Sequence, residues 1–204
     1  MKYQKYIIPV FILVAIVQLA VPLQMIWHKE KVLQNGQIVK FQTAPVDPTD
    51  PFRGKYISLR YDNSLTRFVD EKHKWQVNEP VKVFIRLDNQ GFAHIDSLSK
   101  KSAGTPALYI NARIDFVDEG NNIVGIDYPF NRFYMEEHKA PEAEKIYNQN
   151  RRGSLHKAFA VLKVLEGDAA IIDVVIDKKP IQQVVEQQLD SINASLQRPV
   201  IKNR

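Results

Sequence analysis

The chain contains no cysteine, which excludes disulfide scaffolds, thiolate zinc sites and cysteine nucleophiles. Glycine and proline, with 8 and 11 of 204 residues, are too few for a collagen-like or low-complexity chain. Clustered basic charge is also lacking, because the net charge of +5 is spread over scattered lysines and arginines. Nucleic-acid binding usually needs a basic patch on a recognisable module, so we expect no nucleic-acid partner.

The spacings typical of metal and catalytic sites are lacking as well. The five histidines show no spacing that would place two zinc ligands on one element. Asp47 and Asp50 stand three residues apart, but a calcium site needs more converging oxygen ligands than these two supply. The favoured role of the two aspartates is to stabilise turns beside the neighbouring prolines. The sequence has no nucleophile elbow and no glycine-rich phosphate loop. It therefore predicts no metal, no cofactor and no catalytic residue, and it favours a non-enzymatic protein.

Charge is absent from one long stretch near the N-terminus, between Tyr6 and Trp27. As a helix these residues would span roughly 33 Å, enough to cross a bilayer core of about 30 Å. A cleaved signal peptide would need small residues around its cleavage site, but Ala20 has Gln18 two positions before it. A buried core helix rarely runs so long without a charge. A transmembrane signal anchor over residues 6–27 is therefore the favoured interpretation.

The flanking charges indicate an orientation for this anchor. Two lysines precede it within residues 1–5, whereas the two lysines that follow it are offset by Glu30. The positive-inside rule then makes residues 1–5 a cytoplasmic tail and places residues 28–204 outside. We expect a single-pass protein of the cytoplasmic membrane whose larger, C-terminal part faces the periplasm or the cell exterior.

The rest of the chain is typical of strands joined by turns. Paired apolar or alternating runs predict three hairpins: 81–88 with 92–99, 107–118 with 123–130, and 157–165 with 169–177. Three further elements are predicted: a short strand over 36–44, a short helix over 139–152 and an amphipathic helix over 181–197. The predicted fold class is mainly β (α+β), with an antiparallel sheet or small barrel after the transmembrane helix.

The stretch RGKYISLRY, residues 53–61, is the most distinctive pattern. Prolines spaced three apart precede it and predict an extended connector, after which Gly54 permits a turn. The remainder predicts one regular strand, in which Tyr56 and Tyr61 point to opposite faces. The two tyrosines could line one pocket only if a bulge intervened.

With its lead-in, this stretch resembles the signature of the GDYXXLXY family, which comprises bacterial membrane-anchored proteins of unknown function. The matching residues are Gly54, Tyr56, Leu59 and Tyr61, with Thr43, Pro45, Asp47, Pro48, Asp50 and Arg53 in the lead-in. A second block with Arg132, Phe133, Tyr134 and Glu137 resembles the family's aromatic segment. Lys55 departs from the family pattern, because it stands where the motif has an aspartate.

The resemblance implies an anchored domain in the bacterial cell envelope. Family members are often encoded beside a multi-spanning membrane protein, which implies such a protein as a partner. The expected division of the chain is a tail over 1–5, an anchor over 6–27, a β-rich extracytoplasmic domain over 28–180 and a helical extension over 181–204. The function expected first is therefore a membrane-anchored accessory or interaction domain.

Two interpretations of the motif residues stay open. An arginine beside aromatic residues can bind a carboxylate or phosphate group, which would suit an envelope hydrolase or a small-ligand-binding β domain. Alternatively, Arg53 or Arg132 forms a structural ion pair with Glu137 or Asp50. The candidate binding residues are Arg53, Gly54, Tyr56, Leu59, Tyr61, Arg132, Tyr134 and Glu137.

Overall fold

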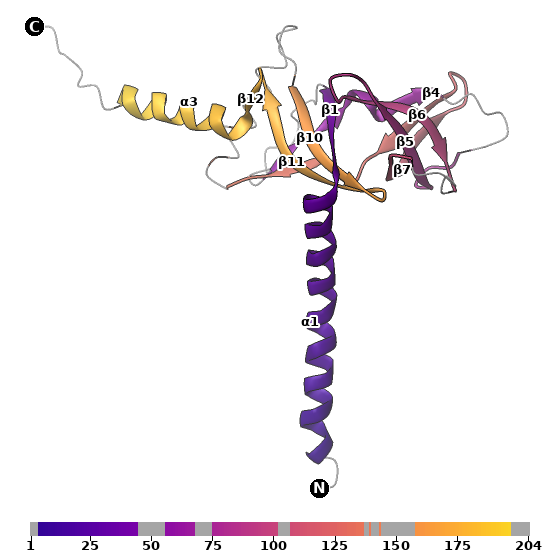
Figure 1. The fold of residues 1–204 in the computed structure, drawn as a ribbon, viewed down its shortest axis with the longest axis vertical. Helices are drawn as coiled ribbons and strands as arrows, with labels where there is room; N and C mark the ends of the chain where they lie inside the picture. Colours follow the sequence, from indigo (N-terminus) through magenta and orange to yellow (C-terminus); the bar gives the residue numbers. More distant parts are fainter. Residues whose placement is uncertain are drawn as a thin grey trace, which may run out of the picture.

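The structure of the protein is a computed structural model. It describes residues 4–44, 56–67, 75–101, 107–136, 139, 143 and 158–196. A long N-terminal helix leads into a body of β-strands, and a shorter C-terminal helix lies beside that body (Figure 1). Most of the described residues outside the two helices are in strands, so the predicted mainly β fold is confirmed.

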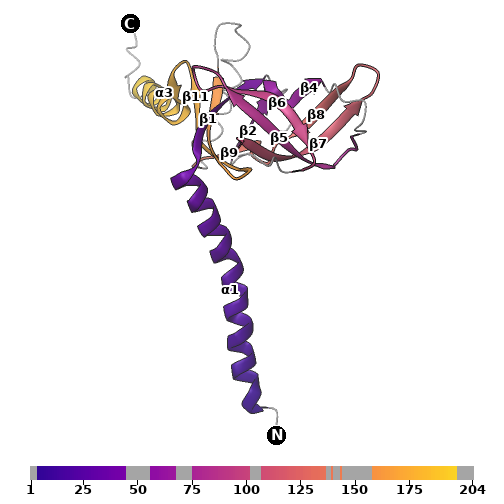
Figure 2. The same ribbon diagram turned by 45° about the vertical axis from the view of Figure 1, so that its right-hand side comes forward.

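Helix α1 runs from Gln4 to Asn35 and continues eight residues beyond the predicted end of the anchor at Trp27. From Ile8 onward it is long and apolar enough to cross a membrane, and none of its apolar window is buried against the body. Side chains such as Phe11 and Leu19 are about 70% exposed. Figure 2 shows this helix projecting away from the strands, as a membrane-spanning segment would.

The first sheet has the strand order β12–β11–β10–β1–β3, and neighbouring strands are antiparallel. Its strands are β1 (Gln37–Ala44), β3 (Arg60–Tyr61), β10 (Ala158–Leu165), β11 (Asp168–Ile176) and β12 (Lys179–Pro180). Burial in β10 alternates strictly, so every second side chain enters the core. The hairpin predicted over 157–177 is confirmed, and its turn places Glu166 and Gly167 at φ angles of 52° and 90°.

The second sheet has the order β4–β8–β7–β5–β6 and is also antiparallel. Its strands are β4 (Leu65–Arg67), β5 (Pro80–Leu87), β6 (Ala93–Ser99), β7 (Tyr109–Asp118) and β8 (Ile123–Asp127). The two hairpins predicted in this region are therefore confirmed. A separate ribbon pairs β2 (Tyr56–Ser58) with β9 (Arg132–Tyr134), and a 3-10 turn, η1 (Asp62–Ser64), precedes β4.

The two large sheets share one apolar core. Val39 and Phe41 of β1 are fully buried, as are Val83 of β5 and Ile110 of β7. Main-chain hydrogen bonds also join the sheets, from the Lys40 N–H to the Gly91 carbonyl and from the Asn111 N–H to the Gly167 carbonyl. Because strands from both ends of the sequence build this core, the chain packs around a single hydrophobic centre.

The C-terminal helix is confirmed as α3, which runs from Ile181 to Leu196. Ile181 and Val185 are fully buried, and the helix contacts β11 and β12. The short helix predicted over 139–152 lies outside the described residues, apart from Lys139 and Ala143. The Ala143 N–H donates to the Lys139 carbonyl, and the Ala143 side chain is buried.

Candidate functional site

The motif stretch does not form the single regular strand that the sequence predicts. Strand β2 ends at Ser58, Leu59 lies between strands, and β3 begins at Arg60. The break occurs because the chain changes partners: β2 pairs with β9, whereas β3 pairs with β1. The Leu59 N–H donates to the Asn131 carbonyl at 2.8 Å, and its side chain is buried. The leucine therefore fixes the crossing from the small ribbon to the first sheet.

Tyr61 belongs to a buried aromatic cluster. Its ring centroid lies 5.5 Å from that of Phe41 and 5.3 Å from that of Phe130, both in edge-on geometry. Its hydroxyl donates to the Phe130 carbonyl at 2.7 Å. Tyr128 completes the cluster, and burial raises the pKa of its phenol well above the ordinary value. Edge-on aromatic packing and a satisfied hydroxyl make this end of the motif a core element.

Tyr56 lies in a different environment, within an exposed cluster on the β2–β9 ribbon. It stands opposite Tyr134 in the ribbon, with ring centroids 5.5 Å apart. The guanidinium carbon of Arg132 lies 5.1 Å from the centre of the Tyr56 ring. A hydrogen bond to Tyr134, together with the nearby phenols, raises the pKa of Arg132 above its ordinary value. We call Tyr56, Arg132 and Tyr134 the surface cluster.

The alternation of β9 sets the direction of this surface cluster. Phe133 is buried, whereas Arg132 and Tyr134 on either side of it are exposed, Tyr134 to 64%. In Figure 2 the ribbon lies in the lower part of the body, towards the end from which α1 leaves. The strands that carry the surface cluster thus lie near the end of the body from which the apolar helix leaves.

The predicted binding residues that the structure describes fall into two places. Leu59 and Tyr61 are buried in the core, while Tyr56, Arg132 and Tyr134 gather at the surface. The remaining candidates, Arg53, Gly54 and Glu137, lie outside the described residues, and so do Lys55 and Asp50. Among the described residues, the contacts of Arg132 are with the two tyrosines.

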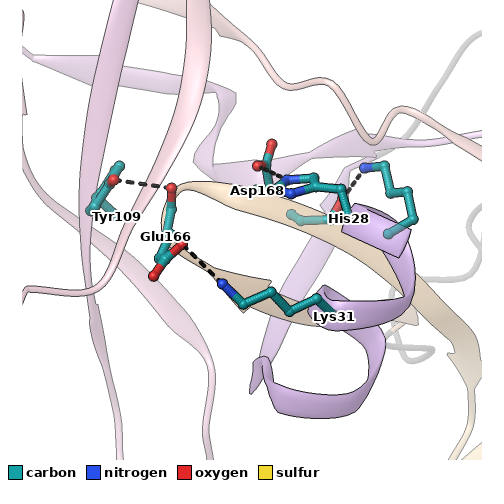
Figure 3. A network of polar contacts seen from close by, with 7 residues as sticks. His28, Lys31, Tyr109, Glu166 and Asp168 are labelled. Carbon is teal, nitrogen blue, oxygen red and sulfur yellow. Dashed lines mark hydrogen bonds and ion pairs between the residues drawn. The ribbon is translucent and has the colours of Figure 1, made fainter. Parts of the chain in front are cut away.

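A second group of polar contacts, which sequence reasoning missed, lies where the hairpin turn between β10 and β11 meets the end of α1 (Figure 3). His28 pairs with Asp168 at 2.5 Å, and Lys31 pairs with Glu166 at 3.6 Å. The Tyr109 hydroxyl donates to the Glu166 carbonyl at 3.0 Å. No sequence signal could have found these contacts, because α1 and the hairpin are about 140 residues apart in the chain.

Two further contacts complete this junction. We call the whole junction of α1 with the β10–β11 hairpin the helix–hairpin clamp. Val32 is fully buried where α1 meets β10 and β11. The Lys163 ammonium group donates to the carbonyls of Leu33 and Gln34, which are left without helical partners at the C-terminal end of α1. A cation at a helix C-terminus also interacts favourably with the helix dipole. The clamp thus ties the apolar helix directly to the first sheet.

A cleft of about 820 Å³ lies between the β5–β6 turn and the strands β1 and β10. The ammonium group of Lys40 lies 5.6 Å from the Phe92 ring centre and 5.8 Å from that of Phe159, and it donates to the Gln90 carbonyl. No residue of the surface cluster lines this cleft. Within the described ranges, no three histidine, aspartate or glutamate side chains are placed to hold a metal ion.

Comparison with known proteins places the chain in a family. The model of the GDYXXLXY protein family matches residues 18–174, from the middle of α1 to β11. The matched region includes the clamp, the buried aromatic cluster and the surface cluster. No curated protein and no solved structure matches the chain. Because the family model covers most of the sequence, the chain is a member of the GDYXXLXY family.

Proposed function

We propose that the protein is a membrane-anchored extracytoplasmic domain that docks on a multi-spanning membrane protein as an accessory or interaction partner. The observation that carries the proposal is α1, whose apolar window makes no buried contact with its own body. An apolar surface of this size needs a lipid or protein environment. The lysines before Tyr6 favour an orientation with the N-terminus in the cytoplasm and the β body outside.

The surface cluster supplies a contact surface for such a partner. Tyrosine and arginine are over-represented among the residues that dominate the binding energy of protein interfaces. Tyr134 is largely exposed, and Arg132 is held against Tyr56, so the three side chains are partly ordered before any partner binds. The strands β2 and β9 that carry the cluster lie near the end of the body from which α1 leaves (Figure 2), which suits a partner held in the same membrane.

The alternative, an envelope hydrolase or a small-ligand-binding domain, requires the motif residues to converge in one pocket. Among the described residues, Leu59 and Tyr61 are in the core and Arg132 and Tyr134 are on the surface. The cleft beside Lys40 contains none of them. Lys55 also replaces the carboxylate of the family motif. The geometry therefore favours docking over catalysis.

Site-specific crosslinking in native membranes tests the proposal. A photo-reactive phenylalanine analogue at Tyr134 should yield an adduct with a multi-spanning protein, identified by mass spectrometry. The same analogue at Phe116, an exposed aromatic residue of the second sheet, should yield little of it. Arg132→Ala should reduce the Tyr134 adduct severalfold, whereas Arg86→Ala, at another exposed arginine, should leave it unchanged. Equal adducts at both positions, or none at either, would refute the docking surface.

A further inference from the structure

One polar residue lies near the middle of the apolar helix. Gln18 is the only residue with a polar side chain between Ile7 and Leu23. It stands twelve positions after Tyr6 and nine before Trp27. At 1.5 Å per residue, it lies roughly 2 Å from the midpoint of that stretch. Its side chain is exposed, and its carboxamide forms no hydrogen bond with the described part of the chain.

The main chain adds a second group that lacks its usual partner at the same residue. In an α-helix the carbonyl of Gln18 would accept from the N–H of the residue four positions later. That residue is Pro22, which lies inside α1 and has no N–H. The carboxamide and the main-chain carbonyl of Gln18 are therefore both available for a hydrogen bond. The hydrocarbon core offers no bulk water, and a neighbouring helix is one source of such a bond.

The helix surface around Gln18 permits another helix to approach closely. Residues three or four positions away lie on the same side of a helix. On this side they are Val14, Ala15, Val21 and Pro22. Ala15 is the smallest of them, and small side chains let two transmembrane helices come close enough for hydrogen bonds across the interface. This side of the helix therefore has both a small residue, Ala15, that permits close packing and a side chain, Gln18, that can form a hydrogen bond.

We propose that α1 pairs in the membrane with α1 of a second copy of this chain, through reciprocal hydrogen bonds between the two Gln18 residues. A carboxamide has both donors and acceptors, so two copies satisfy each other. A copy inserted with the same orientation carries its Gln18 at the same depth, which suits a parallel pair with two-fold symmetry. The freed Gln18 carbonyl gives the partner's carboxamide a further acceptor. The inference rests on the anchoring role in the proposed function, and it adds a partner within the membrane.

Energy transfer between labelled copies in liposomes tests the pairing. The chain has no cysteine, so Glu119→Cys, in an exposed turn, gives full-length protein with a single label site. The otherwise unaltered chain should show transfer that declines as lipid is added. Gln18→Leu should weaken the association by about fivefold to thirtyfold, the range measured for hydrogen bonds between model transmembrane helices. Gln18→Asn keeps a carboxamide and should retain most of the transfer.

Two matched controls separate this contact from general hydrophobic association. Gln24→Leu makes the same chemical change six residues closer to the end of the span, and it should leave the transfer unchanged. Ala15→Cys and Ala20→Cys place single thiols on different sides of α1, the first on the Gln18 side and the second nearly opposite. Oxidation in membranes should crosslink Ala15→Cys strongly and Ala20→Cys weakly.

The outcomes also distinguish this inference from the proposed function. An alkaline wash of the liposomes first establishes whether the chain spans the bilayer. A chain removed by the wash would overturn the anchoring role and the pairing together. A chain that stays in the bilayer without energy transfer at any lipid ratio would overturn the pairing alone. Unchanged transfer in Gln18→Leu would likewise overturn the assignment to Gln18.

Discussion

At the residue scale, the two motif tyrosines have different structural roles. The Tyr61 hydroxyl donates to the Phe130 carbonyl inside the aromatic cluster, at 2.7 Å. Tyr61→Phe would leave that buried carbonyl without this donor, so we expect the free energy of unfolding to fall by about 1–3 kcal/mol. Denaturant unfolding of the full chain in detergent, followed by tyrosine and tryptophan fluorescence, measures the change.

Tyr56→Phe is the matched control for this prediction, because it removes the same hydroxyl from the other tyrosine of the motif. Tyr56 is only partly buried, and its ring packs against Tyr134 and Arg132. We expect its unfolding free energy to stay within about 0.5 kcal/mol of the unaltered chain. Equal losses in the two variants would contradict the division of the motif into a core end and a surface end.

The separation of these tyrosines could be predicted from the sequence, but its cause could not. Strand alternation alone predicts that Tyr56 and Tyr61 point in different directions. The change of strand partner at Leu59 depends on Asn131 and on β1, and residues so far apart in the chain carry no local signal of contact. The surface cluster was predictable as a set of residue types, whereas the contact between Arg132 and the Tyr56 ring required the register of β2 with β9.

At the scale of elements, the contact that holds α1 is apolar, and the charged pairs surround it. The side chains of His28, Lys31 and Glu166 in the two ion pairs are at least half exposed, and that of Asp168 is 41% exposed. Exposed ion pairs contribute about 0–1 kcal/mol each. Val32, by contrast, is fully buried between α1 and the β10–β11 hairpin. Val32 should therefore contribute more to holding the helix against the sheet than either ion pair does.

Val32→Asp should release this end of the helix, because it would bury an unpaired carboxylate. We expect amide hydrogen exchange over residues 28–35 to accelerate by at least about tenfold, the change that a loss of 1.4 kcal/mol in local stability produces. Leu33→Asp introduces the same charge one residue later, at a side chain that is 38% exposed, and it should have a much smaller effect. Similar acceleration in both variants would show that Val32 does not hold the helix.

Among the elements, the three hairpins are those that local sequence patterns were sufficient to predict. Each of the three hairpins has turn residues between two strand-like runs, and each forms as predicted, because a hairpin is specified by neighbouring residues. The order of hairpins within the sheets was not predictable. Strand β1 pairs with β10, more than a hundred residues later, so local periodicity contains no information on that pairing. The contacts of the clamp could not be predicted for the same reason, because they depend on where the β10–β11 turn lies relative to α1.

At the scale of the whole molecule, an exposed apolar helix is joined to a self-contained β body. The core cluster draws on both sheets and on α3, and it includes no residue of α1. The body should therefore fold without its membrane segment. Residues 28–204 retain the clamp, whereas residues 36–204 lose Val32 and the carbonyl groups that bind Lys163.

Thermal unfolding of these two fragments, followed by circular dichroism, tests this division. We expect both to be soluble and rich in β-structure. Burial of one valine stabilises a protein by about 1.5–3 kcal/mol, so residues 36–204 should melt on the order of 5 °C below residues 28–204. Equal melting temperatures would mean that the clamp does not stabilise the body. Failure of both fragments to fold would mean that the body needs the membrane helix, contrary to the separation of α1 from the core.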